Sequence, residues 1–260
     1  MLPAETLALL AAELADADRT RSVIPRITGR YDATVEDSYA IQAIWRDRSV
    51  AAGRRLVGRK IGLTSKAMQA ATGITEPDYG VIFHDTVWEN GAVIPFDRFS
   101  NVRVEVELAF LLSAPLSGPG CTIFDVLRAT EYVVPAVEIL NSHIELGGRT
   151  IVDTIADNAG YGGLVLGGTP VRPDAIDLRW VAALLYRNET IEETGVAAGV
   201  LNHPAAGVAW LANKLHQHDT TLGAGELILA GSFTRPVWVS QNDTILCDYG
   251  PLGTISCRFQ

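Results

Sequence analysis

Two glutamates in an alternating segment of the chain could share one cation. In NVRVEVELAFLL, valine or leucine fills positions 102, 104, 106 and 108, and Arg103, Glu105 and Glu107 occupy the positions between them. Side chains two residues apart on a strand point to the same side, with Cα atoms roughly 7 Å apart, and flexible glutamates can then reach a single ion. A solvent-exposed polar face is the ordinary alternative, and Arg103 could also neutralise both carboxylates in a salt-bridge network.

A third glutamate interrupts a second apolar segment. Glu138 lies within VVPAVEIL, where an unpaired buried charge would cost several kcal/mol. We therefore expect a positive group to compensate it. Three carboxylates suit a hard, oxygen-preferring ion, namely Mg²⁺ with Mn²⁺ as an alternative, better than they suit Zn²⁺. The pattern alone leaves the metal site and the salt-bridge network as open alternatives.

Four further polar residues could contribute to the same chemistry. Lys60 lies among glycines and apolar residues in GRKIGLTSK, so it either extends to the surface or meets an anionic substrate. Asp78 follows a proline in EPDYG, where turn formation is the simpler explanation. Ser232 and Thr234 follow the strand-like segment LILAG, where hydroxyls could bind a carboxylate or merely end the strand.

The elements that must position these side chains indicate an α+β fold. Residues 1–55 predict two helices, the second beginning at Thr34, which form an N-terminal helical cap. From residue 56 strands dominate, and isolated helices interrupt them without regular β–α alternation. This arrangement favours a mixed β-roll or barrel over a doubly wound sheet. We expect residues 56–260 to form one catalytic unit.

Local patterns place individual elements within that unit. We expect strands at 56–64, 102–112 and 133–140, a helical turn at 66–73, a helix at 122–132 and a hairpin centred on residue 188. Pro204 is well placed as the first residue of a helix over 204–215. Four more strands are expected at 226–231, 236–240, 244–250 and 253–259.

Composition excludes several classes of protein. The 260 residues carry a formal net charge of -9, which argues against a nucleic-acid binder. The apolar stretches are broken before they reach the length of a membrane span. The three cysteines are widely scattered, as is typical of reduced thiols in the cytoplasm.

Several motifs together resemble the hydratase branch of the fumarylacetoacetate hydrolase superfamily. They are GRKIGLTSKAMQ, EPDYG, RVEVELAF, VVPAVEIL, DTIADNAG, VAAGVLNHPAAGVAWLANKL and GSFTRPV. The resemblance covers nearly the whole chain and implies a mixed β-roll fold and a homo-oligomer, a pentamer or decamer. It also implies a Mg²⁺ site at Glu105, Glu107 and Glu138, with Lys60 and Asp78 as active-site residues.

The resemblance implies the addition of water to a 2-hydroxy-2,4-dienoate or its 2-oxo tautomer, in the catabolism of aromatic compounds. The product would be a 4-hydroxy-2-oxo acid, with Asp78 moving protons and Ser232 and Thr234 holding a carboxylate. The segment ILNSHIELGGRTIV is shorter and less basic than its counterpart in diacid hydratases, so either Arg149 alone binds a distal carboxylate or the substrate lacks that group. The alternatives are a 2-oxohex-3-enedioate decarboxylase, a 2-oxopent-4-enoate hydratase and, outside enzymes, a metal-dependent binding partner of a pathway enzyme. The resemblance also implies a complex with a pathway decarboxylase or aldolase.

Overall fold

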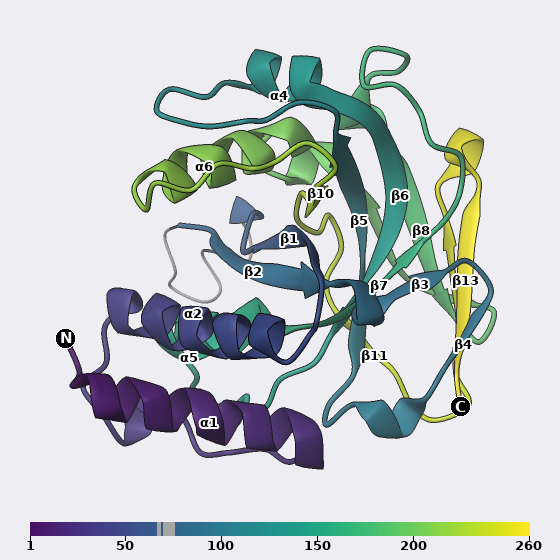
Figure 1. Cartoon of the computed structure of the whole chain (residues 1–260). Coiled ribbons are helices and arrows are strands. Elements are labelled where there is room, and N and C mark those ends of the chain that lie inside the picture. Colours follow the sequence, from purple (N-terminus) through teal and green to yellow (C-terminus); the bar gives the residue numbers. More distant parts are fainter. Residues whose placement is uncertain (67–68, 70–75) are drawn as a thin grey trace.

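The larger of two mixed sheets contains the strands that carry Lys60, Asp78, Glu105, Glu107 and Glu138 (Figure 1). The computed structural model describes residues 1–66, 69 and 76–260. Within these ranges the first sheet has eight strands, in the order β2-β1-β10-β5-β6-β7-β3, and β11 also pairs with β5. Its strands are β1 (Leu56–Gly62), β2 (Asp78–Phe83), β3 (Val87–Glu89), β5 (Arg103–Leu112), β6 (Thr130–Leu140), β7 (Tyr161–Leu166), β10 (Leu227–Leu229) and β11 (Val237–Trp238).

The smaller sheet covers one face of the larger. Its order is β4-β13-β12-β8-β9. Its strands are β4 (Ala92–Ile94), β8 (Ala182–Arg187), β9 (Thr190–Val196), β12 (Thr244–Asp248) and β13 (Thr254–Phe259). The main core includes Val104, Val106 and Leu108 of β5 together with residues of β12 and β13. Fully burying each such side chain contributes about 1.5–3 kcal/mol. This packing fixes which face of β5 is apolar, and so turns its acidic residues to the other side.

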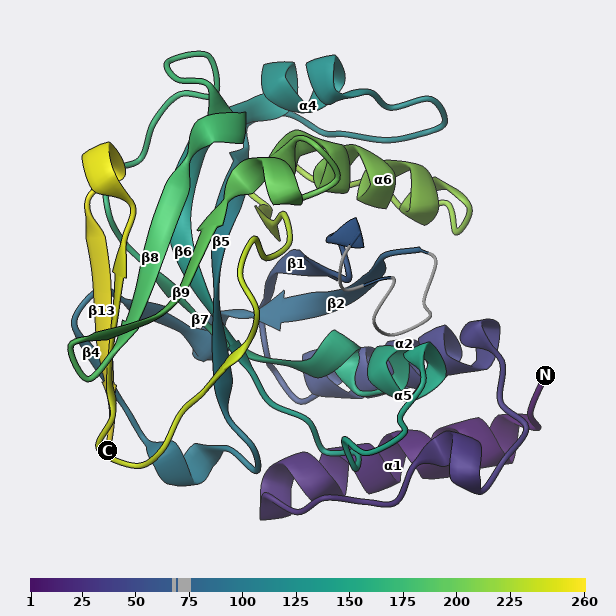
Figure 2. The same cartoon turned by 180° about the vertical axis from the view of Figure 1, so that it is seen from behind.

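Helices pack on both sides of β1 and β2 (Figures 1 and 2), and several begin where a local side chain satisfies their first amide groups. Thr34 and Asp37 form a reciprocal capping box at the start of α2. Pro204 is the first residue of α6, and the ring nitrogen Nδ1 of His203 accepts from the amide of Ala205. The α-helices are α1 (Ala4–Thr20), α2 (Val35–Ala51), α4 (Ile123–Ala129), α5 (Ile151–Ala156) and α6 (Pro204–His216). Short 3₁₀ helices are η1 (Ile27–Gly29), η2 (His84–Thr86), η3 (Phe96–Arg98), η4 (Asn158–Gly160), η5 (Leu178–Trp180), η6 (Ala197–Gly199) and η7 (Gly250–Leu252).

The N-terminal helices pack as a layer against α5 (Figures 1 and 2). Leu10 of α1, Ile41 of α2 and Ala156 of α5 belong to one buried apolar cluster. The side-chain amide of Gln42 donates to the carbonyl oxygens of Tyr79 and Ile155, each at 2.9 Å. The helical layer is therefore tied both to β2 and to α5. In the described part of the chain, no helix is long and apolar enough to cross a membrane.

The structure confirms the predicted α+β class, and it corrects three details. The sheets do not close into a barrel in the described residues. The helix expected at 122–132 ends at Ala129, and β6 begins at Thr130, where it pairs with Leu112 of β5. Asp78 begins strand β2 rather than lying in a turn. The helical turn expected at 66–73 falls largely outside the described residues, and the division at residue 55 stays a prediction.

Candidate active site

Three glutamates from adjacent strands converge on one point. In the antiparallel pairing of β5 with β6, Glu105 lies directly opposite Glu138. Glu107 follows two residues along β5, on the same face. One carboxylate oxygen from each side chain lies within 4.8 Å of the others. Like charges placed directly opposite on neighbouring strands destabilise a sheet, so this arrangement calls for a cation.

The electrostatics of the trio show the same need. Burial raises the pKa of Glu105 to about 8, and the charge of Glu138 adds to the rise. Burial, followed by the charge of Glu138, also raises the pKa of Glu107 well above its usual range. Glu107 and Glu138 are both 1% exposed. Protein neighbours alone therefore leave these carboxylates poorly compensated, and a bound cation would restore their charged form.

Lys60 supplies one positive charge beside the trio. Its ammonium Nζ lies 3.2 Å from Oε1 of Glu138 and donates to the carbonyl oxygen of Ala159 at 2.9 Å. Burial acts to lower the pKa of Lys60, but the carboxylates around it, Glu138 and Asp78 foremost, outweigh burial and raise it. Lys60 therefore stays charged within the site, and the structure excludes the surface-lysine interpretation because the residue is 3% exposed.

Asp78 lies beside Lys60, where a glycine leaves room for both. A Cβ atom added to Gly62 would lie 2.1 Å from Oδ1 of Asp78 and 3.2 Å from Nζ of Lys60. Within the described residues, neither buried carboxyl oxygen of Asp78 has a hydrogen-bond partner. Burial raises the pKa of Asp78 to about 6, although Lys60 opposes the rise. A carboxyl group with this pKa can both accept and donate a proton near neutral pH.

Two arginines line the same cavity. Arg103 is 8% exposed, and its Nε atom has no hydrogen-bond partner within the described ranges. Its guanidinium packs over the ring of Trp238 at 5.2 Å. Burial and, after it, the charge of Arg149 together lower the pKa of Arg103 to about 10. Among the described residues no carboxylate pairs with Arg103 within 4.0 Å, so the predicted rival, an Arg103 salt-bridge network, is not formed.

Ser232 and Thr234 also line the cavity, but their hydroxyls hold the backbone. The Ser232 hydroxyl donates to the carbonyl oxygen of Thr234 at 2.9 Å. The Thr234 hydroxyl accepts from the amide of Val106 at 3.3 Å. These contacts fix the end of the GSFTRP segment against β5. A role for the two hydroxyls in binding a carboxylate stays a prediction.

The structure adds backbone contacts that sequence reasoning missed. The amide of Gly231 donates to Oε2 of Glu107 at 2.9 Å. A Cβ on Gly231 would lie 2.1 Å from the hydroxyl oxygen of Thr64, and the residue has a φ of 110°. Only glycine fits such a position readily. The motif GSFTRPV contains Gly231, so the motif did mark this residue. Its partner Glu107 lies 124 residues away, so residue spacing could not reveal the contact.

The residues present fit a hard divalent cation. The cavity has a volume of about 150 Å³ and contains all three glutamates, Lys60, Asp78, Arg103 and Arg149. Neither carboxylate oxygen of Glu138 has a hydrogen-bond partner in the described part of the chain. Carboxylate oxygens are the ligands that Mg²⁺ and Mn²⁺ prefer. Glu105, Glu107 and Glu138 would therefore hold the ion.

Comparison with known proteins places this fold and site in one family. Residues 53–260 match the family described as fumarylacetoacetate (FAA) hydrolase C-terminal. The chain therefore belongs to the fumarylacetoacetate hydrolase family.

Individual relatives narrow the class of enzyme to hydratases and decarboxylases. The chain is 53% identical to the 2-oxo-hept-4-ene-1,7-dioate hydratase of Escherichia coli, with all of both chains covered. It is 40% identical to a 2-keto-4-pentenoate hydratase of Paraburkholderia xenovorans (strain LB400), over 88% of this chain and 85% of the relative. The 4-oxalocrotonate decarboxylase of Pseudomonas putida G7, solved with magnesium and adipate, superposes with a TM-score of 0.97 at 33% identity, over 100% of this chain and 99% of that chain.

Proposed function

We propose that this chain is a divalent-metal-dependent hydratase that adds water to 2-oxohept-4-ene-1,7-dioate or a close analogue, giving a 4-hydroxy-2-oxo acid. The convergence of Glu105, Glu107 and Glu138 carries this conclusion, because these carboxylates need a cation and suit Mg²⁺. The full-length similarity to a hydratase supports the reaction class and a place in aromatic catabolism. The metal bound by the decarboxylase relative supports the choice of ion.

Each residue of the site then has a chemical task. When bound, a divalent cation supplies Lewis-acid chemistry, because it attracts the carboxylate and 2-oxo oxygens of the substrate and stabilises negative charge that develops there. Lys60 adds a fixed ammonium in a buried site, where its charge acts strongly. Asp78 has free carboxyl oxygens and a pKa of about 6, so it would transfer protons along the substrate chain.

The arginines support a substrate with a second carboxylate. Burial and the nearby charge of Arg149 both lower the pKa of Arg103, so its charged form lacks full compensation. The Nε atom of Arg103 also lacks a hydrogen-bond partner in the described residues. A distal carboxylate between the two guanidiniums would satisfy both deficits. Arg149 and Arg103 would thus both bind the distal carboxylate, a role that the sequence predicted for Arg149 alone.

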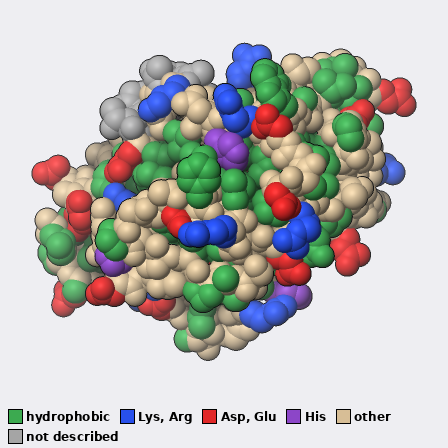
Figure 3. Space-filling model, turned by 90° about the horizontal axis from the view of Figure 1, so that it is seen from above, with side chains coloured by type: hydrophobic (Ala, Val, Ile, Leu, Met, Phe, Trp, Pro, Cys, Tyr) green, Lys and Arg blue, Asp and Glu red, His purple; other side chains and the backbone are tan. Residues whose placement is uncertain are grey.

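The assembly and its location follow as further proposals. Exposed apolar side chains, such as Trp180 at 71% and Phe124 at 71%, support a homo-oligomer, which we propose to be a pentamer or decamer. Seen from above, acidic and basic side chains are interspersed among apolar ones (Figure 3). With the net charge of -9, this surface supports a small-molecule substrate rather than nucleic acid as partner. The three free cysteines support function in the cytoplasm.

The mass of the product tests the reaction. The protein would be incubated with Mg²⁺ and the hydroxydienoate form of the seven-carbon dioate, and the product identified by mass spectrometry. A gain of one water is expected. Loss of CO₂ from 2-oxohex-3-enedioate, assayed in parallel, would instead identify a decarboxylase, the second candidate, which the near-identical fold of the Pseudomonas putida relative favours. Under conditions where Mg²⁺ binds, an unchanged seven-carbon dioate would refute the hydratase, and unchanged 2-oxohex-3-enedioate would refute the decarboxylase.

A further inference from the structure

A short buried turn lies directly behind Lys60. Asn158, Ala159 and Gly160, which form η4, all have positive φ angles, of 49°, 54° and 69°. Glycine and asparagine tolerate this left-handed conformation, whereas it is strained for alanine. Such strain persists only where the surrounding structure fixes the backbone. The turn belongs to the motif DTIADNAG, to which the reaction scheme above assigns no role.

The inner side of the turn contacts the active site through one atom. The carbonyl oxygen of Ala159 accepts the hydrogen bond from Nζ of Lys60 at 2.9 Å. The other close partner of this ammonium is Oε1 of Glu138, at 3.2 Å. The position of the ammonium therefore depends on one ion pair and one hydrogen bond. The ion-pair partner, Glu138, is a proposed metal ligand, and the hydrogen-bond acceptor is a backbone atom of a strained turn.

The side chain of Asn158 clamps this turn to β2, the strand that pairs with β1, which carries Lys60. Its amide nitrogen donates to the carbonyl oxygen of Val81 at 3.0 Å, and its Oδ1 accepts from the amide of Val81 at 2.8 Å. Val81 lies on β2, where its neighbour Gly80 pairs directly with Lys60 on β1. These two hydrogen bonds therefore link the turn to β2 next to the residue that pairs with Lys60.

Gly80 packs closely against Asn158, so the turn and β2 are in tight contact. A Cβ atom on Gly80 would lie 2.4 Å from the carbonyl oxygen of Asn158 and 2.9 Å from its Oδ1. Contacts this short cannot be accommodated unless the turn moves away from β2. A change at Gly80 would thus disturb the clamp from the opposite side.

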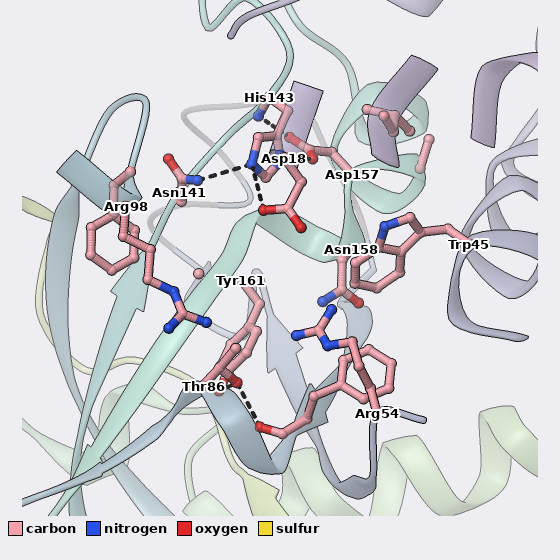
Figure 4. A pocket seen from close by; sticks show the side chains of 15 residues that line it. Asp18, Trp45, Arg54, Thr86, Arg98, Asn141, His143, Asp157, Asn158 and Tyr161 are labelled. Atoms are coloured by element: carbon pink, nitrogen blue, oxygen red, sulfur yellow. Dashed lines mark hydrogen bonds and ion pairs between the residues drawn. The ribbon is translucent and has the colours of Figure 1, made fainter. Parts of the chain in front are cut away.

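A second set of contacts holds the turn from outside (Figure 4). Asp157 immediately precedes the turn, and its carboxylate accepts from the hydroxyl of Ser142 at 2.9 Å and from the ring of His143 at 2.8 Å. The His143 ring also lies 3.5 Å from the carboxylate of Asp18 on α1. Asp157 and Asn158 both line a cavity of about 60 Å³ on this side. The turn is therefore fixed on both of its sides.

We propose that Asn158 is a positioning residue for Lys60: its clamp on Val81 holds the strained turn so that the Ala159 carbonyl keeps the ammonium aimed into the active site. The inference rests on the proposed function for the catalytic role of Lys60. Asn158 does not line the substrate cavity, whereas Ala159 does, so Asn158 acts on Lys60 through the position of the Ala159 carbonyl. It is expected to act on the turnover rate rather than on substrate or metal binding.

Chemical labelling tests the positioning without any turnover. The chain has three lysines, Lys60, Lys66 and Lys214, so the last two serve as internal references. We expect Asn158→Ala and Gly80→Ala to increase acylation of Lys60 by acetic anhydride at least fivefold relative to the references. Tyr161→Phe is the matched control, because it removes a buried hydrogen bond to Thr86 from the same cavity and leaves the turn intact.

Kinetics provide the second readout. Asn158→Ala should lower kcat about tenfold or more and change KM and the half-saturating Mg²⁺ concentration less than twofold. Asn158→Asp should give an intermediate rate, because aspartate can accept from the Val81 amide but cannot donate to its carbonyl. Tyr161→Phe should keep kcat within twofold of the wild-type value, although it should lose about as much thermal stability as Asn158→Ala.

Two results would overturn the positioning role. One is Lys60 labelling in Asn158→Ala that matches the Tyr161→Phe control, and the other is a kcat that matches that control. If Asn158→Ala fails to fold, Asn158→Asp is judged by the same labelling criterion. Failure of the proposed function would look different, because the wild-type protein would then give no product while its labelling pattern still answered the positioning question.

Discussion

Replacement of Glu107 by glutamine should have opposite effects on thermal stability with and without a divalent cation. In the absence of metal, burial and Glu138 raise the pKa of Glu107 well above its usual range. A carboxyl group whose pKa is raised by folding destabilises the protein as pH rises from its unfolded pKa towards its folded one. Glutamine has nearly the same size, carries no such penalty, and its carbonyl oxygen can still accept from the Gly231 amide.

The magnitude follows from linkage. At pH 7.5 the penalty has an upper bound of about 4 kcal/mol, since each pH unit above the unfolded pKa is worth about 1.4 kcal/mol over roughly 3 units. We expect Glu107→Gln to recover about 1–2 kcal/mol of it, because the new amide must also find partners. For a chain of 260 residues, this is a rise in Tm of about 2–8 °C.

In saturating Mg²⁺ the wild-type protein should become more stable than Glu107→Gln. If the wild-type site is at about 100 times its Kd, binding adds about 2.7 kcal/mol, whereas a site weakened about 100-fold gains about 0.4 kcal/mol. Thermal unfolding would be followed by circular dichroism after EDTA treatment and along a Mg²⁺ series. Glu192→Gln, at an ion pair with Arg187 in the second sheet, is the control and should change neither value by more than about 1 °C. A variant that is less stable without metal and gains as much from Mg²⁺ as wild type would refute the reasoning.

Three further changes probe other parts of the account. Asp78→Asn should lower kcat about 10²–10⁴-fold, the range for a lost general acid or base, with an unchanged half-saturating Mg²⁺ concentration; a fall of less than tenfold in steady-state assays would exclude Asp78 as the proton carrier. Arg149→Met should raise KM for the seven-carbon dioate about 10–100-fold and leave KM for 2-hydroxypenta-2,4-dienoate, which lacks the distal carboxylate, unchanged; equal effects on both substrates would place Arg149 elsewhere. Burial lowers the pKa of His143, but Asp157 and Asp18 outweigh it and raise the pKa to about 10, so its stabilisation is complete below about pH 6.5 and is lost as pH rises through about 10. Urea unfolding should therefore show His143→Gln less stable than wild type by about 1.5–3 kcal/mol at pH 6 and nearly equal at pH 10.5, and a constant difference would contradict this assignment.

The sequence was most informative along β5, where apolar residues and charged residues alternate. Alternation along β5 predicted that Glu105 and Glu107 share a face, because the opposite face is continuously apolar and must pack on a core. The interruption of an apolar segment likewise predicted a compensated Glu138. These inferences are local, and each depends on residues within one strand.

The sequence was least informative where distant segments meet. That Glu105 lies opposite Glu138 depends on the register of β5 with β6, which tertiary packing sets. Lys60 meets the Ala159 carbonyl across 99 residues of chain, so residue spacing gives no sign of it. Asp78 follows a proline and resembles a turn residue, yet pairing with Gly62 of β1 makes it the first residue of a strand. Long-range pairing here outweighs the local turn preference.

We propose that the three glutamates hold one divalent ion and that this ion binds a 2-oxo acid. The sharpest test is a titration of the metal-free protein with Mn²⁺, followed by electron paramagnetic resonance of both the free and the bound ion. We expect one Mn²⁺ per chain, a changed signal of the bound ion when a 2-oxo acid is added, and loss of this binding in Glu107→Gln. Binding that survives the substitution, or a bound-ion signal that ignores the 2-oxo acid, would contradict it.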